Sequence, residues 1–383
     1  MADLQSTHFE IMSHPPAKHV TFAYVGRLQS RGRLLKQIAT LQKAGVTCDV
    51  ILGNTITQQP NPDEFGFQIR AFPVDENSGR LASFYNQMRF CQKAGRMIAA
   101  GMADTVVCVS LESLMAGVMA KRIRPQLRLV FDNNELQIES FESRVKRAVW
   151  RPIHNYAVRR CDIILHAESN RRDYFKLTYP GRNKPQEVIE NFPFWVTTEP
   201  QSKEPNGDVH VIYLGGFGTG RYTFEILEAF AIQPDNVRLD IVGFGNNDYV
   251  AKVQARIVEL GNDRIRILPP VPYLQIGALL SKYHIGLAFY KNTDLNNYYC
   301  APNKVYDYLM NGMPVIANAY PGLLGVIAKN QVGVCIDTVD AASIGSAIHT
   351  ILENRMWENI TSELRRLYCW EQQEAKYLAV FGH

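Results

Sequence analysis

The sequence predicts an α/β protein with two Rossmann-like, doubly wound parallel-sheet domains. The first observation is that apolar runs at residues 19–25 and 208–214 each lead into a glycine-containing loop and then into a segment of helical periodicity. The second is that the other short strands are apolar throughout, as strands of a parallel sheet covered by helices on both faces are. With 383 residues, the chain is long enough for two such cores.

The first domain is expected to span residues 1–195. Its strand at 19–25 leads into a polar loop and a helix at 34–44. Ligands of doubly wound sheets bind at loops that follow the carboxyl ends of strands, and Gly26 and Arg27 occupy such a loop. A turn glycine and a surface arginine explain the same two residues almost as well. The later elements are expected as strands at 48–54, 105–110, 127–132 and 161–169, and as helices at 111–123 and 141–160.

The second domain is expected to span residues 196–369. Its first strand is followed by a glycine-rich turn, in which Gly215, Gly216 and Gly218 let the backbone approach a phosphate closely. The turn is not the dinucleotide fingerprint GxGxxG, because Arg221 stands where the last glycine would be. The later elements are expected as a strand and turn at 238–248, and as two strands with a short helix between them at 264–290.

The stretch 298–317 combines a polar loop, an amphipathic helix and a buried strand. Pro302 favours a first helical turn, and Gly312 is suited to end the helix. Pro314 cannot continue it, and the apolar run that follows is typical of a strand buried on both faces.

The start of this helix is a candidate anion site. Unpaired backbone N–H groups and the positive end of the helix dipole favour an anion there, and Lys304 adds a full charge. Asp307 lies one turn after Asn303, so it is able to accept hydrogen bonds from ribose hydroxyls. Together these groups suit a nucleotide diphosphate. A solvated helix start with a capping amide is the alternative interpretation.

The stretch resembles the donor-site signature of the retaining nucleotide-sugar glycosyltransferases of GT-B architecture, in particular the family called glycosyl transferases group 1. The residues that carry the resemblance are Pro302, Lys304, Asp307, Gly312, Pro314, Val315 and Ile316. It implies two domains that face each other across a cleft. It also implies a terminal helix, residues 370–383, that packs back on the first domain.

The resemblance implies roles for individual residues. Arg221 and Lys304 would hold the donor diphosphate, and Asp307 would contact the ribose. Val271 and Tyr273 lie in a segment that holds the nucleobase in the family, although core or turn roles suit them better. The full predicted donor-binding set is Gly26, Arg27, Gly215, Gly216, Gly218, Gly243, Val271, Tyr273, Tyr299, Pro302, Asn303 and Asp307.

The chain departs from the family pattern at several positions. Tyr299 stands where the family has the first of two glutamates, and Gly216 replaces a second arginine. Asn134 stands where histidine is common, and a neutral amide cannot act as a base. Glu135 is retained, and it is expected either to orient an acceptor hydroxyl or to cap the helix that begins near Ile138.

The predicted activity is transfer of a sugar from a nucleotide-sugar donor to a glycan or lipid-linked glycan with retention of configuration, in surface polysaccharide assembly of the bacterial type. Arg221, Lys304 and Glu135 are the candidate catalytic residues. No DxD sequence occurs, so we expect no metal or other cofactor, and no nucleic-acid partner. The alternatives are a UDP-sugar 2-epimerase, which has the same architecture, and a carbohydrate-binding subunit with impaired catalysis.

The first domain is a candidate for peripheral contact with a membrane. Residues 1–195 carry 26 Lys and Arg against 18 Asp and Glu, whereas the remainder carries 15 against 19. The helix at 141–160 is basic and amphipathic and includes Trp150, like an interfacial helix. Its apolar stripe also suits packing on the domain's own sheet. Scattered cysteines and the lack of a signal or membrane-spanning segment predict a cytoplasmic protein with reduced thiols.

Overall fold

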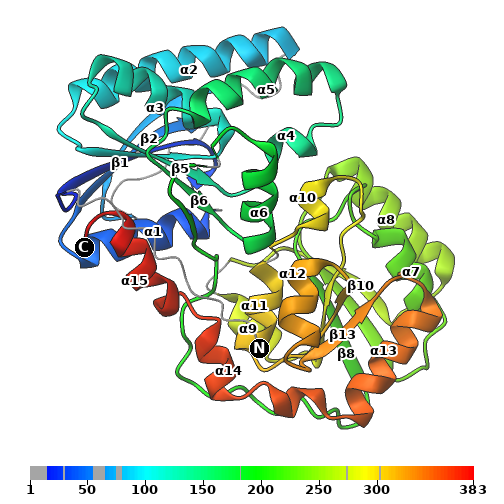
Figure 1. Ribbon diagram of the computed structural model, residues 1–383. Helices are drawn as coiled ribbons and strands as arrows, with labels where there is room; N and C mark the ends of the chain where they lie inside the picture. The colour runs from blue at the N-terminus through cyan, green and yellow to red at the C-terminus, as the bar shows by residue number, and fades with distance from the viewer. Residues whose placement is uncertain are drawn as a thin grey trace. The chain divides into compact units, whose positions relative to one another are not determined.

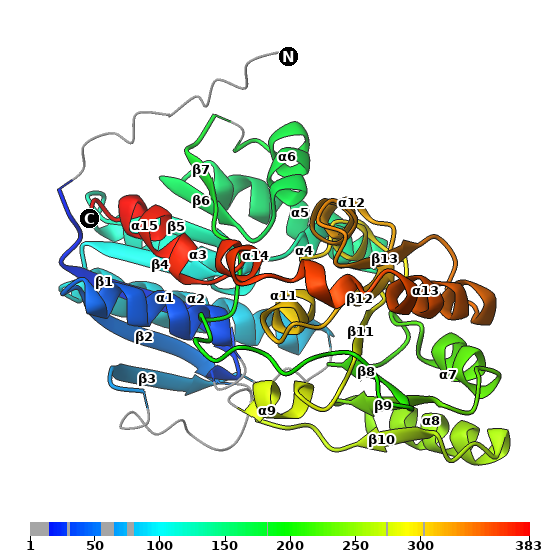
Figure 2. The ribbon, with the colours of Figure 1, turned by 90° about the horizontal axis from the view of Figure 1, so that it is seen from below.

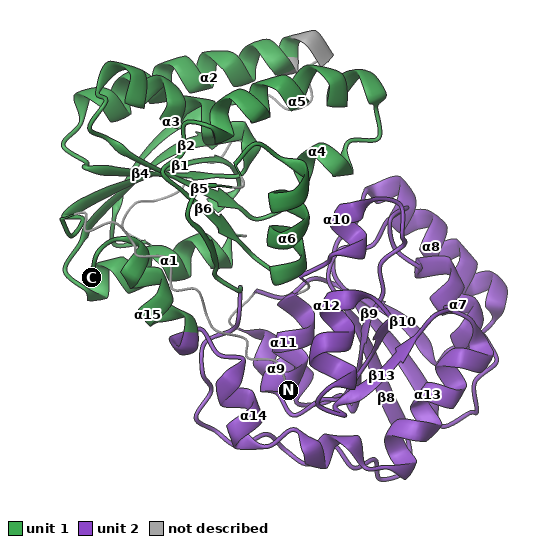
Figure 3. Cartoon of the chain, in the orientation of Figure 1, with its two compact units in different colours: residues 1–190, 373–383 green, residues 191–372 purple. Residues whose placement is uncertain are grey.

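The protein divides into two compact units (Figure 3). The computed structural model describes residues 15–28, 31–54, 65–74, 80–181, 183–272, 275–301 and 303–383, without the side chains of residues 80, 81 and 83. Unit 1 comprises residues 1–190 and 373–383, and unit 2 comprises residues 191–372. The first boundary therefore lies five residues before the one expected from the sequence, and the terminal segment is assigned to unit 1.

Unit 1 contains a seven-stranded sheet in the order β3-β2-β1-β4-β5-β6-β7. All of its strand pairs are parallel, as predicted. The order runs outward in both directions from β1 and β4, which is the doubly wound arrangement. The strands are β1 His19–Gly26, β2 Thr47–Asn54, β3 Gln68–Pro73, β4 Thr105–Val109, β5 Arg128–Asn133, β6 Ile163–His166 and β7 Gln186–Val188.

Helices cover both faces of this sheet (Figure 1). Residues of α2, α3 and α5 share one apolar core with β1, β4 and β5. Helices α1 and α15 lie on the opposite face (Figure 1), and the backbone N–H of Ala17 donates to the carbonyl of Phe381 just beyond α15. The helices of unit 1 are α1 Gly32–Lys43, α2 Arg80–Ala100, α3 Leu111–Ile123, α4 Gln137–Ser140, α5 Arg144–Val158, α6 Ser169–Thr178 and the terminal α15 Glu371–Val380.

The structure of α5 corrects one expectation about membrane contact. The helix is shorter than expected, and Trp150 at its centre is only 9% exposed. The indole packs edge-on against Phe84 of α2, with 5.6 Å between the ring centroids. Trp150 therefore belongs to the core of unit 1 and is not available at a membrane interface. Of the helices that the structure describes, none is long and apolar enough to cross a bilayer.

Unit 2 contains a six-stranded parallel sheet in the order β10-β9-β8-β11-β12-β13 (Figure 2). The order reverses between β8 and β11, so this unit is doubly wound as well. The strands are β8 Val209–Leu214, β9 Val237–Val242, β10 Ile265–Leu268, β11 Ile285–Ala288, β12 Val315–Asn318 and β13 Gly333–Ile336. Together with unit 1, this arrangement confirms the predicted fold of two parallel-sheet α/β domains.

The helices of unit 2 form two separate cores, one on each face of the sheet. Helices α7, α8 and α13 pack on one face, and α9, α11 and α12 pack on the other. The expected end of α11 is confirmed, because Gly312 has a φ of +70° and its N–H donates to the carbonyl of Leu309. The helices are α7 Thr223–Ala231, α8 Asn247–Leu260, α9 Ile276–Leu280, α10 Leu295–Tyr298, α11 Asn303–Met310, α12 Pro321–Leu323, α13 Ala341–Glu353 and α14 Ser362–Leu367.

Candidate functional site

The candidate site of unit 2 lies where the strand order reverses. In a doubly wound sheet, ligands bind outside the carboxyl ends of the two strands at this switch point. The glycine-rich turn follows β8, and Tyr290 follows β11, the neighbouring strand. Helix α11 then returns the chain from β11 to β12 and carries Lys304 in its first turn. The topology therefore brings together three segments that are far apart in the sequence.

Two glycines of the predicted set are required by a close approach of the backbone. Gly215 has a φ of +119°, which favours glycine. A Cβ atom on Gly243 would lie 1.9 Å from the carbonyl oxygen of Gly215, so no side chain fits there. The carbonyls of the turn have partners in the same unit: that of Gly216 accepts from the Tyr213 hydroxyl at 3.1 Å, and that of Gly218 accepts from the Arg221 N–H at 3.0 Å.

Arg221 and Lys304 lie over the faces of two tyrosine rings beside this turn. The guanidinium carbon of Arg221 is 4.3 Å from the ring centroid of Tyr290. The Nζ atom of Lys304 is 4.0 Å from the ring centroid of Tyr213 and 5.3 Å from that of Tyr290. Aromatic faces stabilise cations without neutralising them. Among the residues that the structure describes, neither side chain forms an ion pair, so both are available to an anionic ligand.

Local contacts orient each of these side chains. Arg221 donates from Nη1 to its neighbour's carbonyl, that of Gly220, at 2.9 Å, and to Oδ1 of Asn297 at 3.4 Å. Lys304 is held by its helix, because the Tyr308 hydroxyl accepts from the backbone N–H of Leu214 at 2.9 Å and joins α11 to β8. These bonds fix the position of the two cations relative to the glycine turn.

The electrostatics of Lys304 differ from those of an exposed lysine. Burial of the ammonium, with the nearby Arg221 as a second cause, lowers the pKa of Lys304 to about 7. An uncompensated buried ammonium favours its neutral form. A phosphate next to Nζ would reverse this effect, because an opposite charge stabilises the ammonium.

The remaining predicted residues of α11 and its surroundings occupy different environments. Asn303 is exposed at the start of α11, and Asp307 one turn later is only 9% exposed. Tyr299 is half-buried, with its ring centroid 5.0 Å from that of Tyr298. Val271 is half-buried in the loop after β10. Pro302 and Tyr273 lie outside the described residues.

The predicted residues of unit 1 lie at the corresponding edge of its own sheet. Gly26 ends β1 with a φ of +137°, and a Cβ atom there would lie 2.3 Å from the hydroxyl oxygen of Tyr24. Arg27 is exposed in the next position. Glu135 follows β5 and is exposed, but it does not cap a helix: the N-cap of α4 is Leu136, which makes no capping side-chain bond. The expected cap is therefore wrong.

A polar cluster that was not predicted lies at the same edge of unit 1. Nε2 of Gln137 donates to both carboxylate oxygens of Glu112, at 2.7 and 2.8 Å, and Oε1 of Gln137 accepts from the N–H of Leu111. Desolvation raises the pKa of Glu112, with Glu135 adding to the rise and Arg31 opposing it. Perturbed carboxylates at such positions are functional-site candidates. The available sequence signal was an acid at the start of an otherwise apolar helix.

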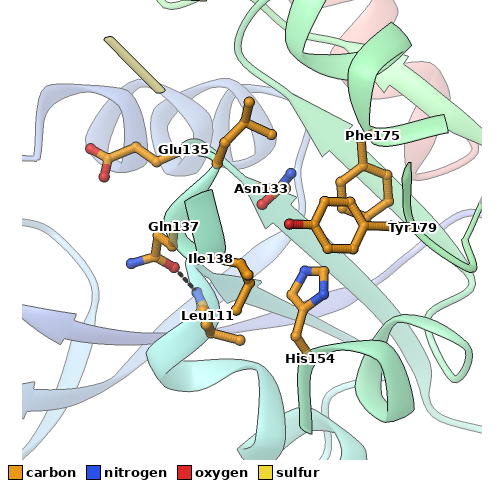
Figure 4. A pocket seen from close by; sticks show the side chains of 9 residues that line it. Leu111, Asn133, Glu135, Gln137, Ile138, His154, Phe175 and Tyr179 are labelled. Atoms are coloured by element: carbon orange, nitrogen blue, oxygen red, sulfur yellow. Dashed lines mark hydrogen bonds between the residues drawn. The ribbon is translucent and has the colours of Figure 1, made fainter. Parts of the chain in front are cut away.

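Figure 4 shows the small pocket beside this cluster, in which Glu135 points away from the aromatic side chains. His154 lies among Phe131, Phe175 and Tyr179, and burial lowers its pKa to about 4. A neutral imidazole packed among aromatic rings is part of the core. In the described residues, no three His, Cys, Asp or Glu side chains gather as metal ligands do. The expectation that no metal is needed stays a prediction.

Comparisons with known proteins agree with the predicted resemblance. Residues 197–367 match the family model described as glycosyl transferases group 1. This match spans nearly all of unit 2 and includes Arg221, Lys304 and Asp307. The resemblance is therefore confirmed for unit 2, whose sequence matches the model of this glycosyltransferase family. Among curated proteins, no sequence matches the chain.

Solved structures show the GT-B fold over nearly the whole chain. The sucrose-phosphate synthase of Thermosynechococcus elongatus is similar over 94% of this chain and 97% of its own, with a TM-score of 0.74 and 14% identity. HepE of Anabaena, solved with UDP and glucose, is similar over 94% and 98%, with a TM-score of 0.72 and 15% identity. A putative UDP-N-acetylglucosamine 2-epimerase of Listeria monocytogenes is similar over 95% of each chain, with a TM-score of 0.65 and 12% identity.

Proposed function

We propose that the protein transfers a sugar from a nucleotide-sugar donor to a glycan or lipid-linked glycan, with retention of configuration. The observation that carries the proposal is that two basic side chains, Arg221 and Lys304, lie together over tyrosine rings at the switch point of unit 2. A diphosphate leaving group gains negative charge as the glycosidic bond breaks, so cations at this position stabilise the transition state more than the ground state.

The proposed reaction needs no group on the protein to form a covalent bond. The bond between the anomeric carbon and the phosphate oxygen breaks, and a bond from that carbon to the acceptor hydroxyl oxygen forms on the same face. The hydroxyl proton passes to the leaving phosphate. Lys304 and Arg221 would stabilise the negative charge on the diphosphate, and Asp307 would bind the ribose. The oxocarbenium-like character of such transition states supports this distribution of roles.

For the acceptor, we assign the polar cluster of unit 1. The Glu112 carboxylate accepts two hydrogen bonds from Gln137 and keeps lone pairs for sugar hydroxyls. Arg31, whose Nε donates to the Tyr24 hydroxyl at 2.5 Å, lies close enough to affect the pKa of Glu112. Glu135 is exposed beside them. Carboxylates and an amide at a switch point suit a neutral polyol better than a second diphosphate.

The test is a donor panel followed by an acceptor panel. A thermal-shift screen with nucleotide sugars identifies the donor. Transfer to candidate glycans is then measured through the release of nucleotide. A product anomer that matches the donor anomer supports retention. Failure of every nucleotide sugar and nucleoside diphosphate to bind would contradict the assignment of unit 2.

A UDP-sugar 2-epimerase is the alternative enzyme, because a protein carrying that name has the same fold. It predicts that the C2 configuration of a UDP-sugar changes without any acceptor. A carbohydrate-binding subunit with impaired catalysis is the non-enzymatic alternative, favoured by Tyr299, Gly216 and Asn134. It predicts donor binding without turnover. One incubation with and without acceptor separates all three functions.

We also propose that unit 1 meets an anionic membrane surface through α5, in a cytoplasmic protein. Although Trp150 is buried, Val145 is 73% exposed and Val149 is 46% exposed one turn later. The helix carries Arg144, Lys146, Arg147 and Arg151 and no acid, but Arg151 already pairs with Glu139 at 2.8 Å, which leaves three cations for the surface. Each cation contributes about 1 kcal/mol at an anionic surface, less as salt rises. Sedimentation with anionic vesicles at low and high salt tests this, and binding unaffected by Arg144→Glu with Lys146→Glu would contradict it.

A further inference from the structure

A basic hollow lies in unit 1 at the end of the sheet where strand β6 begins. It has a volume of about 390 Å³, within the range of small-molecule sites. The polar cluster of unit 1 lies at the opposite edge, where the strands end. The cations that line the hollow come from three segments: Lys121 and Arg122 from the end of α3, Arg160 from the end of α5, and Lys184 from the loop before β7.

The acid in the lining, Asp162, already has partners. Its Oδ2 accepts from Lys121 and, at 2.7 Å, from the backbone N–H of Leu129 at the start of β5. The backbone N–H of Asp162 donates in turn to the carbonyl of Leu129 at 2.8 Å. Asp162 therefore neutralises Lys121 and joins two strands, and it leaves the other three cations without compensation.

Those three cations form no ion pair with any described residue. Arg160 stacks on Tyr156, with its guanidinium carbon 3.4 Å from the ring centroid, and donates from Nη1 to the Tyr156 carbonyl. This arrangement orients the guanidinium and retains its charge. Lys184 is half-buried, and like Lys121 it lies near enough to the buried Cys161 thiol to counteract the rise in that pKa. The three cations therefore lie together beside the start of β6.

Stabilisation of helix ends explains only part of this arrangement. Lys121 and Arg122 lie in the last turn of α3, and Arg160 lies just past Arg159, the C-cap of α5. A cation at a helix carboxyl end is worth about 0.3–1 kcal/mol. Lys184 follows α6 by six residues and ends no helix. The two helix ends contribute roughly half a negative charge each. They therefore offset about one of the three uncompensated cations and leave an excess of about two positive charges.

We propose that this hollow binds a phosphate-bearing anion, at a site separate from the donor site of unit 2. Guanidinium groups bind phosphate oxygens in pairs and ammonium groups bind them as point charges, so two arginines and one lysine suit a phosphate group. The buried Val118 and the exposed Pro125 give the hollow apolar walls. A soluble phosphorylated compound and a phospholipid headgroup share this chemistry.

The test uses the full chain with the donor site disabled by Lys304→Ala and Arg221→Ala. Inorganic pyrophosphate is titrated into this protein by calorimetry at low and high salt. We expect one equivalent to bind, at least tenfold more weakly after Arg122→Glu or Lys184→Glu. The control is Lys18→Glu, which changes the net charge of unit 1 equally at an exposed residue outside the hollow. Arg122→Gln provides a milder variant should a reversed charge disturb folding, which circular dichroism reports.

A second arm separates the two sources of phosphate. The same proteins are sedimented with vesicles of phosphatidylglycerol and of phosphatidylcholine. Pyrophosphate binding that depends on Arg122 indicates a soluble ligand, and binding to phosphatidylglycerol vesicles alone with the same dependence indicates a headgroup. The proposal is overturned if neither probe binds, or if the reversals at Arg122 and Lys184 change binding no more than Lys18→Glu does. The result does not depend on the function proposed for the other sites.

Discussion

The two units begin in the same way and diverge in charge. In unit 1, β1 ends in Tyr24, Val25 and Gly26, and in unit 2, β8 ends in Tyr213 and Leu214 before Gly215. Both glycines have positive φ values, and in both units a cation lies over the tyrosine ring. The difference comes from a helix between the fourth and fifth strands, which supplies a carboxylate in one unit and an ammonium in the other.

This difference gives the same topology opposite charges at equivalent positions. In unit 1 the helix α3 contributes Glu112, and in unit 2 the helix α11 contributes Lys304. Each residue lies in the first turn of its helix, next to the switch point. A cation beside a second cation attracts a diphosphate, whereas a carboxylate beside a cation offers acceptors and donors to neutral hydroxyls. The proposed assignment of the donor to unit 2 and of the acceptor to unit 1 depends on this difference in charge.

The largest expected effect is the removal of both cations of unit 2. Lys304→Ala and Arg221→Ala should each reduce kcat/KM for the donor at least tenfold, and the double variant at least a hundredfold. A charge-assisted hydrogen bond is worth about 1.5–3 kcal/mol, and each 1.4 kcal/mol is tenfold in rate. Steady-state kinetics measures the change, with Lys329→Ala, an exposed lysine of the same unit, as the control. Normal donor kinetics in folded variants would refute the donor site.

The sequence indicated the candidate site of unit 2 more fully than the polar cluster of unit 1 for a physical reason. The elements near Lys304 are local: a helix of eight residues with a glycine stop and a buried strand close behind it. The stacking of Lys304 on Tyr213 joins residues 91 positions apart, and no local pattern encodes it. The hydrogen-bond partner of Glu112 is Gln137, 25 positions away. The two residues come together only because β4 and β5 are neighbouring strands in the folded sheet, so the sequence alone does not reveal the cluster.

Two elements that escaped prediction, α2 and β3, have sequences in which packing overrides the pattern. Helix α2 contains Gly95, which weakens a helical signal. A Cβ atom there would lie 2.8 Å from Cβ of Met119, so the glycine is what allows α2 and α3 to pack closely. Strand β3 is half-exposed at the sheet edge and lacks the continuous apolar run of the inner strands. Trp150 gave a misleading signal, because an indole suits a core as well as an interface.

The next effect concerns the carboxylate of unit 1. Glu112→Gln keeps the shape and removes the charge, so it should reduce kcat/KM for the acceptor about tenfold through the loss of a charge-assisted hydrogen bond. Donor affinity should stay unchanged, because the residues assigned to the diphosphate and the ribose belong to unit 2. Transfer kinetics at saturating donor gives the first quantity, and calorimetry with UDP gives the second. A loss of both together would mean that Glu112 acts on the donor or on folding.

A smaller effect follows from the pKa of Lys304. With a pKa of about 7 in the free protein, the ammonium is half neutral at pH 7. A bound diphosphate raises this pKa, so binding takes up a proton and weakens as the pH rises, by about fivefold between pH 7 and pH 8. Between about pH 7 and the ordinary pKa of a lysine, Lys304 is protonated in the unfolded chain and largely neutral in the folded protein. The free energy of unfolding of the free protein therefore increases as the pH rises above 7.

Calorimetry with UDP across this pH range measures the effect, since a phosphate with a second pKa of about 6 is already ionised there. Lys304→Gln supplies the control, because without the titrating ammonium the affinity should become flat between pH 7 and pH 8. An unchanged slope in that variant would assign the pH dependence to another group.

The smallest effect concerns Asn297, which orients Arg221 without facing the ligand in our assignment. Its Nδ2 donates to Oγ1 of Thr293 at 3.0 Å and to Oδ2 of Asp294 at 3.2 Å, and its Oδ1 accepts from Arg221. Asn297→Ala removes one neutral-acceptor bond to the guanidinium, worth about 0.5–1.5 kcal/mol. We therefore expect kcat/KM for the donor to fall about threefold, with the acceptor KM unchanged.

The matched control for this prediction is Asn330→Ala in the same unit. Asn330 also donates two side-chain hydrogen bonds, to the Val326 carbonyl and the Tyr368 hydroxyl, so its loss reports the general cost of removing a bonded amide. A second comparison adds Asn297→Ala to Arg221→Ala. If Asn297 acts through Arg221, the double variant binds UDP no more weakly than Arg221→Ala alone, because the group that it orients is gone. Additive losses would instead show that Asn297 contacts the donor itself, which would place the α10 segment in direct contact with the sugar or its phosphate.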